Sequence, residues 1–413
     1  MAGQKRQFAG GSIPRYLFMG SALFLTCFGV VMIYSASSIK ALAADGTSIA
    51  FVRSQILFAV IAWTIALVLS RFDYRRFKET HMLWWSGAVG LLVIVLGIGV
   101  VSHGARRWIP LGFINLQPSE LAKIACVIAV AAVAVDWQRG RLSTKDFLIR
   151  AMWLTAIPAA LIMMQPDMGT TATLIVAVVI VLILAGVSLT WVFGSAATLV
   201  ALGVVFVASS AYRMRRVAGF LDPWKDQSGN GYQIVQALYA FGSGGVKGVG
   251  LGLSRQKFFY LPEAHTDFIL AIIGEEVGLI GTLAIVVAFG VFAYAGLRIA
   301  AGAKDSFGKL LAGGMTGMLA FQAAINMAAV TGLMPVTGKP LPFVSYGGAS
   351  MLVTMIAVGL VLSVSEYGTL APRAVKGPRP VEERQRESGH ERRRDSRARV
   401  SGTERRGQTR RRA

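Results

Sequence analysis

The strongest candidate for chemistry is a carboxyl group at the start of an apolar run. In YLPEAHTDFILAIIGEEVGLIG, residues 260–281, Asp267 stands where polar residues give way to apolar ones. A carboxylate partly removed from water binds a proton more tightly, which suits a general base that accepts a proton from a hydroxyl group. A helix cap is the alternative, since Thr266 or Asp267 could accept a hydrogen bond from the following amides. The spacing leaves both interpretations open.

Two more acidic residues lie deeper in the same run. Glu275 and Glu276 follow Asp267 by about two helical turns, and an unpaired carboxylate at that depth in a membrane is costly. They must therefore face the interior of a bundle and find partners there. Because neighbouring helical residues point about 100° apart, we expect the two glutamates to have different roles, with at least one in a structural pair.

A second segment combines arginines with a helix start. GARRWIPLGFINLQPSELAKIA, residues 104–125, places Arg106 and Arg107 in a loop and Glu120 and Lys123 early in an apolar helix. The guanidinium fork matches phosphate oxygens, although arginine beside tryptophan also anchors proteins at membrane interfaces. The i, i+3 spacing of Glu120 and Lys123 predicts a pair that fixes helix geometry rather than one that catalyses.

Two shorter motifs offer one charged residue each. QPDMGTT, residues 165–171, contains Asp167, which is either a second carboxylate of the site or, as the preceding proline favours, a turn former. TGKPLPFVSYGGAS, residues 337–350, contains Lys339. This lysine could contact a phosphate, or its loop could serve helix packing alone.

The elements that position these groups are predicted to be membrane helices. The 413 residues are 54% hydrophobic and only 15% charged, which excludes an ordinary soluble protein. A helix needs about 20 apolar residues to span a bilayer, so the sequence predicts an all-α, polytopic transmembrane bundle of about ten helices. Cys27 and Cys126 fall in separate spans and are expected to be packing residues. The expected spans are residues 17–37, 52–70, 83–102, 119–136, 147–164, 169–186, 189–208, 268–297, 308–331 and 343–364.

The basic residues predict the orientation, because lysine and arginine in short loops stay on the cytoplasmic side. With the N-terminus inside, thirteen basic residues fall in the N-terminus and the inner loops, and four fall in the short outer loops. We therefore expect both termini in the cytoplasm. The loops at 103–117, 165–168, 209–267 and 332–343 then lie outside, so the motifs share the outer face and predict an outward-facing site.

The large extracytoplasmic loop is 209–267. Loops of this length are usually functional, and its basic residues, Arg216 among them, form a rim that would attract anionic headgroups. Its glycines from Gly242 to Gly252 indicate either close backbone approach or mobility.

The remaining regions are the chain ends, so we divide the chain into residues 1–16, a membrane domain at 17–366 and a tail at 367–413. The tail carries 15 basic and 6 acidic residues after position 370, and it cannot bury enough surface to fold alone. We expect a disordered cytoplasmic segment held near anionic lipid, or a docking segment for an acidic partner. The net charge of +21 is confined to loops and tails, so it does not indicate nucleic-acid binding.

The four motifs, in this order and with these separations, resemble the shape, elongation, division and sporulation family over roughly residues 15–366. PEAHTDFI and LPFVSYGG are most similar to its division members. The resemblance implies an inverting peptidoglycan glycosyltransferase that uses lipid II, extends the glycan outside the membrane and releases undecaprenyl pyrophosphate.

The resemblance also implies roles for single residues. Asp267 would deprotonate the 4-hydroxyl of the acceptor N-acetylglucosamine, which attacks the anomeric carbon of N-acetylmuramic acid on the donor. The pyrophosphate or headgroup ligands would be Arg107, Lys339, Arg216, His265 and Ser345. A divalent cation, Mg²⁺ or Mn²⁺, could assist the leaving group, although the sequence contains no dedicated metal-binding motif.

Partners and location follow from the same resemblance. It implies a class B penicillin-binding protein, other division proteins, lipid II and membrane lipids as partners, at the septum of a bacterial inner membrane. Three alternatives stay open: a lipid II flippase, whose intramembrane charges would line a headgroup pathway; a scaffold, for which Asp267 is expendable; and an elongation-type polymerase of the side wall.

Overall fold

The computed structural model describes residues 12–367, apart from 103–104, 113–114, 193, 195–207, 209–210 and 230. Residues 368–413 of the tail therefore lie outside the described residues, as do most residues of the expected span 189–208. Nine helices among the described residues are long and apolar enough to cross a membrane, so the chain is a multi-pass membrane protein. They are α1 (Ser12–Asp45), α2 (Ala50–Ser70), α4 (His81–Ile98), α5 (Pro118–Gln138), α6 (Thr144–Met164), α7 (Met168–Ala185), α12 (Gly278–Ala301), α13 (Ser306–Val330) and α14 (Gly348–Tyr367).

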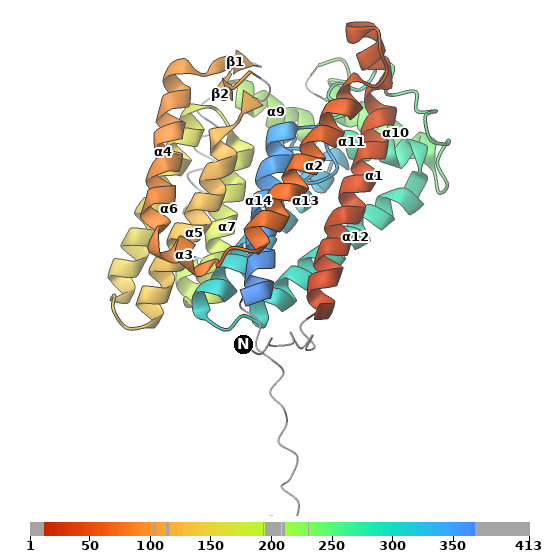
Figure 1. Cartoon of the computed structure of the whole chain (residues 1–413). Coiled ribbons are helices and arrows are strands. Elements are labelled where there is room, and N and C mark those ends of the chain that lie inside the picture. The colour runs from red at the N-terminus through yellow and green to blue at the C-terminus, as the bar shows by residue number, and fades with distance from the viewer. Residues whose placement is uncertain are drawn as a thin grey trace, which may run out of the picture. The chain divides into compact units, whose positions relative to one another are not determined.

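Helix α5 forms the centre of one group of helices. Its residues from Pro118 to Val135 are buried with the single exception of Leu121, and it contacts α4, α6, α7 and α13. Its run of alanine and valine keeps side chains small, which lets neighbouring helices approach closely. The long helices run side by side in Figure 1, where α14 packs on α2 and α12 lies between α1 and α13.

The expected span 83–102 is too long at its C-terminal end, because α4 stops at Ile98 and a strand follows. Strands β1 (Val100–Ser102), β2 (Ala105–Pro110) and β3 (Asn115–Leu116) form an antiparallel sheet in the order β1-β2-β3. The expected loop 103–117 is thus largely a hairpin, and Figure 1 shows β1 and β2 beyond the end of α4.

The expected span 268–297 is wrong as a single helix. It is broken at Val277 into α11 (Ile269–Glu276) and α12, whose first residue, Gly278, has φ 71°. The break leaves backbone groups without helical partners, and the glycine run supplies new ones. Val249 N–H donates to Glu275 O at 2.9 Å, and Leu279 N–H donates to Gly245 O at 2.9 Å.

The glycine run therefore serves close backbone approach, one of the two interpretations left open by the sequence. A Cβ atom on Gly248 would lie 2.2 Å from Glu276 O, and one on Gly244 would lie 1.9 Å from Gly274 O. Irregular backbone at membrane depth is tolerated only where other protein groups satisfy it. The loop that contains these glycines meets this condition for the broken helix.

Two other expectations on segment structure need correction. The span expected at 343–364 starts at Gly348, because residues 340–347 form a turn-containing loop. The large loop 209–267 contains helices α9 (Ala211–Leu221) and α10 (Tyr232–Gly244), of which α10 packs against α11. A short helix α3 (Arg75–Glu79) connects α2 to α4.

Candidate active site

The four motif-bearing segments come together at one end of the bundle, which we call the motif end: residues 105–112 with 115–117, 165–167, 262–267 and 337–346. Arg107 donates from Nε to Gln165 O at 2.8 Å and from Nη2 to Pro166 O at 2.6 Å. Ser345 Oγ donates to Thr266 O at 2.6 Å. Segments 58 to 79 residues apart in sequence are therefore joined by direct hydrogen bonds.

Asp167 combines both roles that the sequence left open. Its side chain caps α7 by accepting from Thr170 N–H at 3.0 Å, and it also accepts from Lys339 Nζ at 2.9 Å and Gln117 Nε2 at 3.0 Å. Burial alone would raise the pKa of Asp167, but the charges of Lys339 and Arg107 outweigh it and lower this pKa to about 2. The residue is a turn former and a charged member of the motif end.

Lys339 is buried between two carboxylates. Its Nζ lies 2.9 Å from Asp167 Oδ2 and 3.6 Å from Glu120 Oε1, and the residue is only 4% exposed. Burial alone would lower the pKa of Lys339, but Asp167 and Glu120 raise it. The ammonium group is thus used inside the protein, and its predicted contact with pyrophosphate stays a prediction.

Glu120 and Lys123 lie together as their spacing predicts. Lys123 Nζ is 2.9 Å from Glu120 Oε2, and both side chains are almost completely buried. Lys123 also donates to Gln322 Oε1 at 2.7 Å, and Gln322 Nε2 donates to Pro340 O at 3.2 Å. Together with Asp167 and Lys339, this pair forms a cluster of two carboxylates and two lysines. The contacts within this cluster and through Gln322 hold the 337–345 loop against α5 and α13.

Asp267 lies two residues before the start of α11 and is partly exposed. The N-cap position of α11 is Phe268, without a side-chain cap, and the Thr266 hydroxyl donates to Glu263 instead. Asp267 Oδ2 lies 3.7 Å from the position that a Cβ atom on Gly338 would occupy. The glycine therefore keeps the space beside this carboxylate open.

Asn326, which the sequence analysis did not single out, holds the backbone beside this carboxylate. Its Nδ2 donates to Asp267 O at 2.8 Å and to Lys339 O at 2.7 Å. Asn326 and Asp267 also line a cavity of about 10 Å³ with Thr337, Gly338 and Lys339. A polar amide inside an apolar span was the available signal, because such groups must find partners.

His265 and Ser345 are packed rather than open to a ligand. The His265 ring lies edge-on to Phe51 at 5.2 Å between centroids and next to Tyr346 at 5.8 Å. Burial and, secondarily, Lys40 lower the pKa of His265 to about 4, so its ring is neutral at pH 7. The Ser345 hydroxyl also accepts from Leu341 N–H at 2.8 Å. Their role as headgroup ligands stays a prediction.

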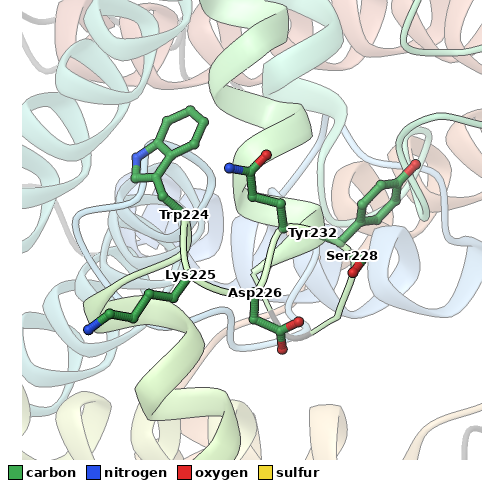
Figure 2. A pocket seen from close by; sticks show the side chains of 6 residues that line it. Trp224, Lys225, Asp226, Ser228 and Tyr232 are labelled. Atoms are coloured by element: carbon green, nitrogen blue, oxygen red, sulfur yellow. The ribbon is translucent and has the colours of Figure 1, made fainter.

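Arg216 falls in α9, but its side chain lies outside the described part of the structure. Nearby, residues of the turn between α9 and α10 line an open surface depression of about 450 Å³. Figure 2 shows it lined by Trp224, Lys225, Asp226, Ser228 and Tyr232. The depression mixes aromatic rings with charges of both signs, and the basic rim expected of loop 209–267 stays a prediction.

The expectation that Glu275 and Glu276 have different roles is wrong. Glu275 accepts from Ser254 Oγ, and from Arg255 N–H at 2.9 Å, while Glu276 accepts from Ser254 N–H at 3.3 Å and pairs with Lys257 Nζ at 3.3 Å. Both carboxylates bind the segment 254–257. Two neighbouring side chains that point in different directions can bind one segment here because α11 ends at Glu276. The segment 254–257 lies across this helix end and contacts both carboxylates.

A divalent cation has no preformed cage in the described segments. No group of three or more His, Cys, Asp and Glu side chains gathers there in a metal-binding arrangement. Asp167 and Glu120 are already neutralised by lysines. The expected cation stays a prediction.

Comparison with known families decides the relationship that the motifs suggest. The sequence profile of the cell cycle protein family of FtsW, RodA and SpoVE matches residues 15–370. The chain belongs to this family. Two relatives illustrate the similarity. A probable peptidoglycan glycosyltransferase FtsW of Trichlorobacter lovleyi is 44% identical over 84% of this chain and 92% of its own length. The stage V sporulation protein E of Bacillus subtilis is 39% identical over 86% and 97%.

Solved structures of the FtsW, RodA and SpoVE family share the fold. A chain from a peptidoglycan synthase complex, described as showing structural coordination of polymerization and crosslinking, superposes with a TM-score of 0.70 and 27% identity. The match covers 84% of this chain and 96% of that one. The rod shape determining protein RodA of Thermus thermophilus gives a TM-score of 0.63 and 25% identity over 85% and 96%.

Proposed function

We propose that this protein is a peptidoglycan glycosyltransferase that polymerises lipid II at the division septum, with Asp267 as the general base. The names of the relatives support the activity and the division role. The observation that carries the assignment of the base is the position of Asp267. Asp267 is partly exposed where the motif-bearing segments meet, whereas Asp167 and Glu120 in the same cluster are buried.

The proposed reaction is a single displacement with inversion. The Asp267 carboxylate accepts the proton of the acceptor 4-hydroxyl as that oxygen attacks the anomeric carbon of N-acetylmuramic acid on the donor. The bond from that carbon to the pyrophosphate oxygen breaks, and undecaprenyl pyrophosphate leaves with the bonding electron pair. A base that is partly exposed can meet a substrate while its protein surroundings keep it oriented.

The leaving pyrophosphate needs positive charge nearby, and Arg107 is the best placed cation. Its guanidinium is partly buried and spends Nε and Nη2 on the carbonyl groups of the 165–166 turn, which orients the remaining donors of a five-donor group. Lys339 would first have to leave Asp167 and Glu120. We therefore assign Arg107 to the ligand and regard Lys339 chiefly as the anchor of its loop.

The orientation in our proposal follows the basic loops. Residues of several of these loops contact one another at the end of the bundle opposite to the motif end: Lys78 Nζ lies 3.6 Å from Asp136 Oδ1, and Arg75 Nε lies 3.2 Å from Asp305 Oδ2. Basic loops stay in the cytoplasm, so the motif end faces outward from a bacterial inner membrane. The similarity to a chain of a peptidoglycan synthase complex supports a class B penicillin-binding protein as partner.

The buried charges favour a polymerase over a flippase. A headgroup pathway needs polar groups that face an open route through the membrane. Glu120 is paired with Lys123 at 2.9 Å, and Glu276 with Lys257 at 3.3 Å. All four side chains are buried, and their charges are used within the protein.

One reconstitution separates a polymerase from a flippase and from a scaffold. The full chain is purified with its penicillin-binding partner, the transpeptidase is blocked, and fluorescent lipid II is supplied in detergent, where translocation has no meaning. The proposal predicts glycan strands from the wild type and none from Asp267→Ala. Equal polymerisation by a folded Asp267→Ala protein would rule out the general base. If the wild-type chain formed no polymer in a complex whose penicillin-binding partner is active, the polymerase would be ruled out.

A further inference from the structure

Asn326 is a buried amide near the C-terminal end of α13 and is only 2% exposed. Its two N–H donors point to two separate segments: Nδ2 lies 2.8 Å from Asp267 O and 2.7 Å from Lys339 O. Both donors of one amide group are therefore engaged. They tie the backbone beside the candidate base to the loop that contains Lys339.

We propose that Asn326 is a positioning residue for Asp267. The inference rests on the proposed function, because it assumes that Asp267 accepts the proton. A general base must be held within a fraction of an ångström of its productive position, and a displacement of about 1 Å can cost roughly 100-fold in rate. Asn326 provides this constraint from a membrane helix, which is a more rigid support than the loops on either side.

The hydrogen-bonding balance of Asn326 supports a role beyond packing. Its Oδ1 is buried and has no hydrogen-bond partner among the residues that the structure describes. An apolar side chain of the same shape would avoid that cost. The amide is thus explained by its two donors rather than by its acceptor, and both donors act on the segments that carry Asp267 and Lys339.

The local geometry shows what the constraint protects. Asp267 Oδ2 lies 3.7 Å from the Cβ position of Gly338, which directly precedes Lys339. The cavity of about 10 Å³ between these segments has room for about one water molecule. Loss of either hydrogen bond to Asn326 would let the two segments move apart or close this space, and the carboxylate would shift with them.

The same helix provides a matched control. Gln322 lies one turn before Asn326 and is equally buried, at 1% exposed. It donates to the same loop, at Pro340 O, and accepts from Lys123 Nζ at 2.7 Å. A substitution at Gln322 therefore loosens the 337–345 loop and removes a buried amide, as a substitution at Asn326 does. It keeps the hydrogen bond from Asn326 Nδ2 to Asp267 O.

The test measures steady-state polymerisation of lipid II by the full chain in complex with its partner. Asn326→Leu is expected to lower kcat about 100-fold with KM within about twofold of wild type, because only the transition state is affected. Gln322→Leu is expected to lose less than about fivefold in kcat. The inference is overturned by a kcat loss under about tenfold in Asn326→Leu, by an equal loss in Gln322→Leu, or by an effect confined to KM.

Two additions keep the outcome decisive. If Asn326→Leu does not fold, Asn326→Ser retains one hydroxyl donor and is expected to lose about tenfold in kcat, and a loss under about threefold overturns the inference. Asp267→Asn is measured in parallel. If Asp267→Asn is fully active, the proposed function fails. If Asp267→Asn is inactive while the Asn326 variants behave like wild type, only the positioning role fails.

Discussion

The two ends of the bundle use aspartate in different ways. At the motif end, Asp267 is held through its backbone carbonyl by Asn326, and the residue is partly exposed. At the opposite end, which we call the basic end (residues 71–80, 136–143, 302–308 and 363–367), Asp305 caps α13 by accepting from Gly308 N–H at 2.8 Å. It also accepts from the Tyr74 hydroxyl, and from Arg75 Nε at 3.2 Å.

The difference separates a structural carboxylate from a candidate chemical one. The carboxylate of Asp305 binds a helix N-terminus and two neighbouring side chains, and these contacts, against the opposing effect of burial, lower its pKa. Arg75 belongs to the same cluster, and its pKa is raised, chiefly through its hydrogen bond to Asp305. Asp305 thus stabilises the fold, whereas Asp267 is partly exposed beside the cavity that Asn326 and Lys339 line.

Surface labelling tests whether the two ends face opposite sides of the membrane, and the expected effect is all or none. In a chain with Cys27 and Cys126 replaced by alanine, exposed Pro262→Cys at the motif end should react with a membrane-impermeant maleimide in right-side-out vesicles. Arg141→Cys, from the exposed side chain at the basic end, should react only after permeabilisation. The reverse pattern would place the motif end in the cytosol and exclude the proposed polymerase.

The buried charges of the motif end should matter far more than exposed pairs. Lys339→Met leaves Asp167 and Glu120 without their shared cation, so the free energy of unfolding should fall by about 3–5 kcal/mol. Lys225→Met is the control, because Lys225 pairs with Asp222 at 3.2 Å while 84% exposed, and it should cost less than about 1 kcal/mol. Similar losses in both variants, measured by denaturant or thermal unfolding, would contradict the described burial.

The glycine run from Gly242 to Gly252 should tolerate an added methyl group at one position and not at another. Gly248 has φ 79°, and a Cβ atom there would lie 2.2 Å from Glu276 O, so Gly248→Ala should cost about 2 kcal/mol. Gly242 in α10 has no neighbouring atom within 4 Å of its Cβ position. Gly242→Ala should stabilise the helix by up to about 1 kcal/mol. Equal thermal stability of the two variants would show that the loop is not packed as described.

A smaller effect is expected from His265, which stays neutral at the motif end because its pKa is lowered to about 4. In the unfolded chain the pKa is about 6.5, so the unfolded state binds a proton first as the pH falls. The stabilising contribution is therefore present above pH 6.5 and is lost between pH 6.5 and 4, by about 1 kcal/mol between pH 7 and 5.5. His265→Gln should remove this part of the pH dependence, and an unchanged slope in that variant would exclude His265 as its source.

The sequence predicted much of the framework because apolar length and basic loops are local signals. Nine of the expected spans correspond to helices in the described residues, if the α11–α12 pair is taken as one broken span. Because successive loops alternate between the two sides of the membrane, the order of the spans predicted that the four motif-bearing segments lie at the same end. The i, i+3 spacing predicted the contact between Glu120 and Lys123. These features depend on few residues that are close in sequence.

What could not be predicted depends on distant partners. The apolar run at 269–301 gives no sign of its break, because the groups that satisfy the break come from the glycine loop about 30 residues earlier. Lys339 pairs with Asp167, 172 positions away, so its charge looked available to a ligand. Asn326 and Gln322 were visible as polar residues in an apolar helix, but their carbonyl partners were not.

The most direct test compares Asp267→Ala with Asp305→Ala, in each case by turnover of lipid II per folded complex and by thermal unfolding. We predict that Asp267→Ala loses about 1,000-fold in kcat while its melting temperature stays within about 3 °C of wild type. Asp305→Ala should lose about 2 kcal/mol of stability and keep kcat within about threefold. A stable, active Asp267→Ala protein would contradict the assignment of the base, as would an Asp305→Ala protein that folds normally but cannot polymerise.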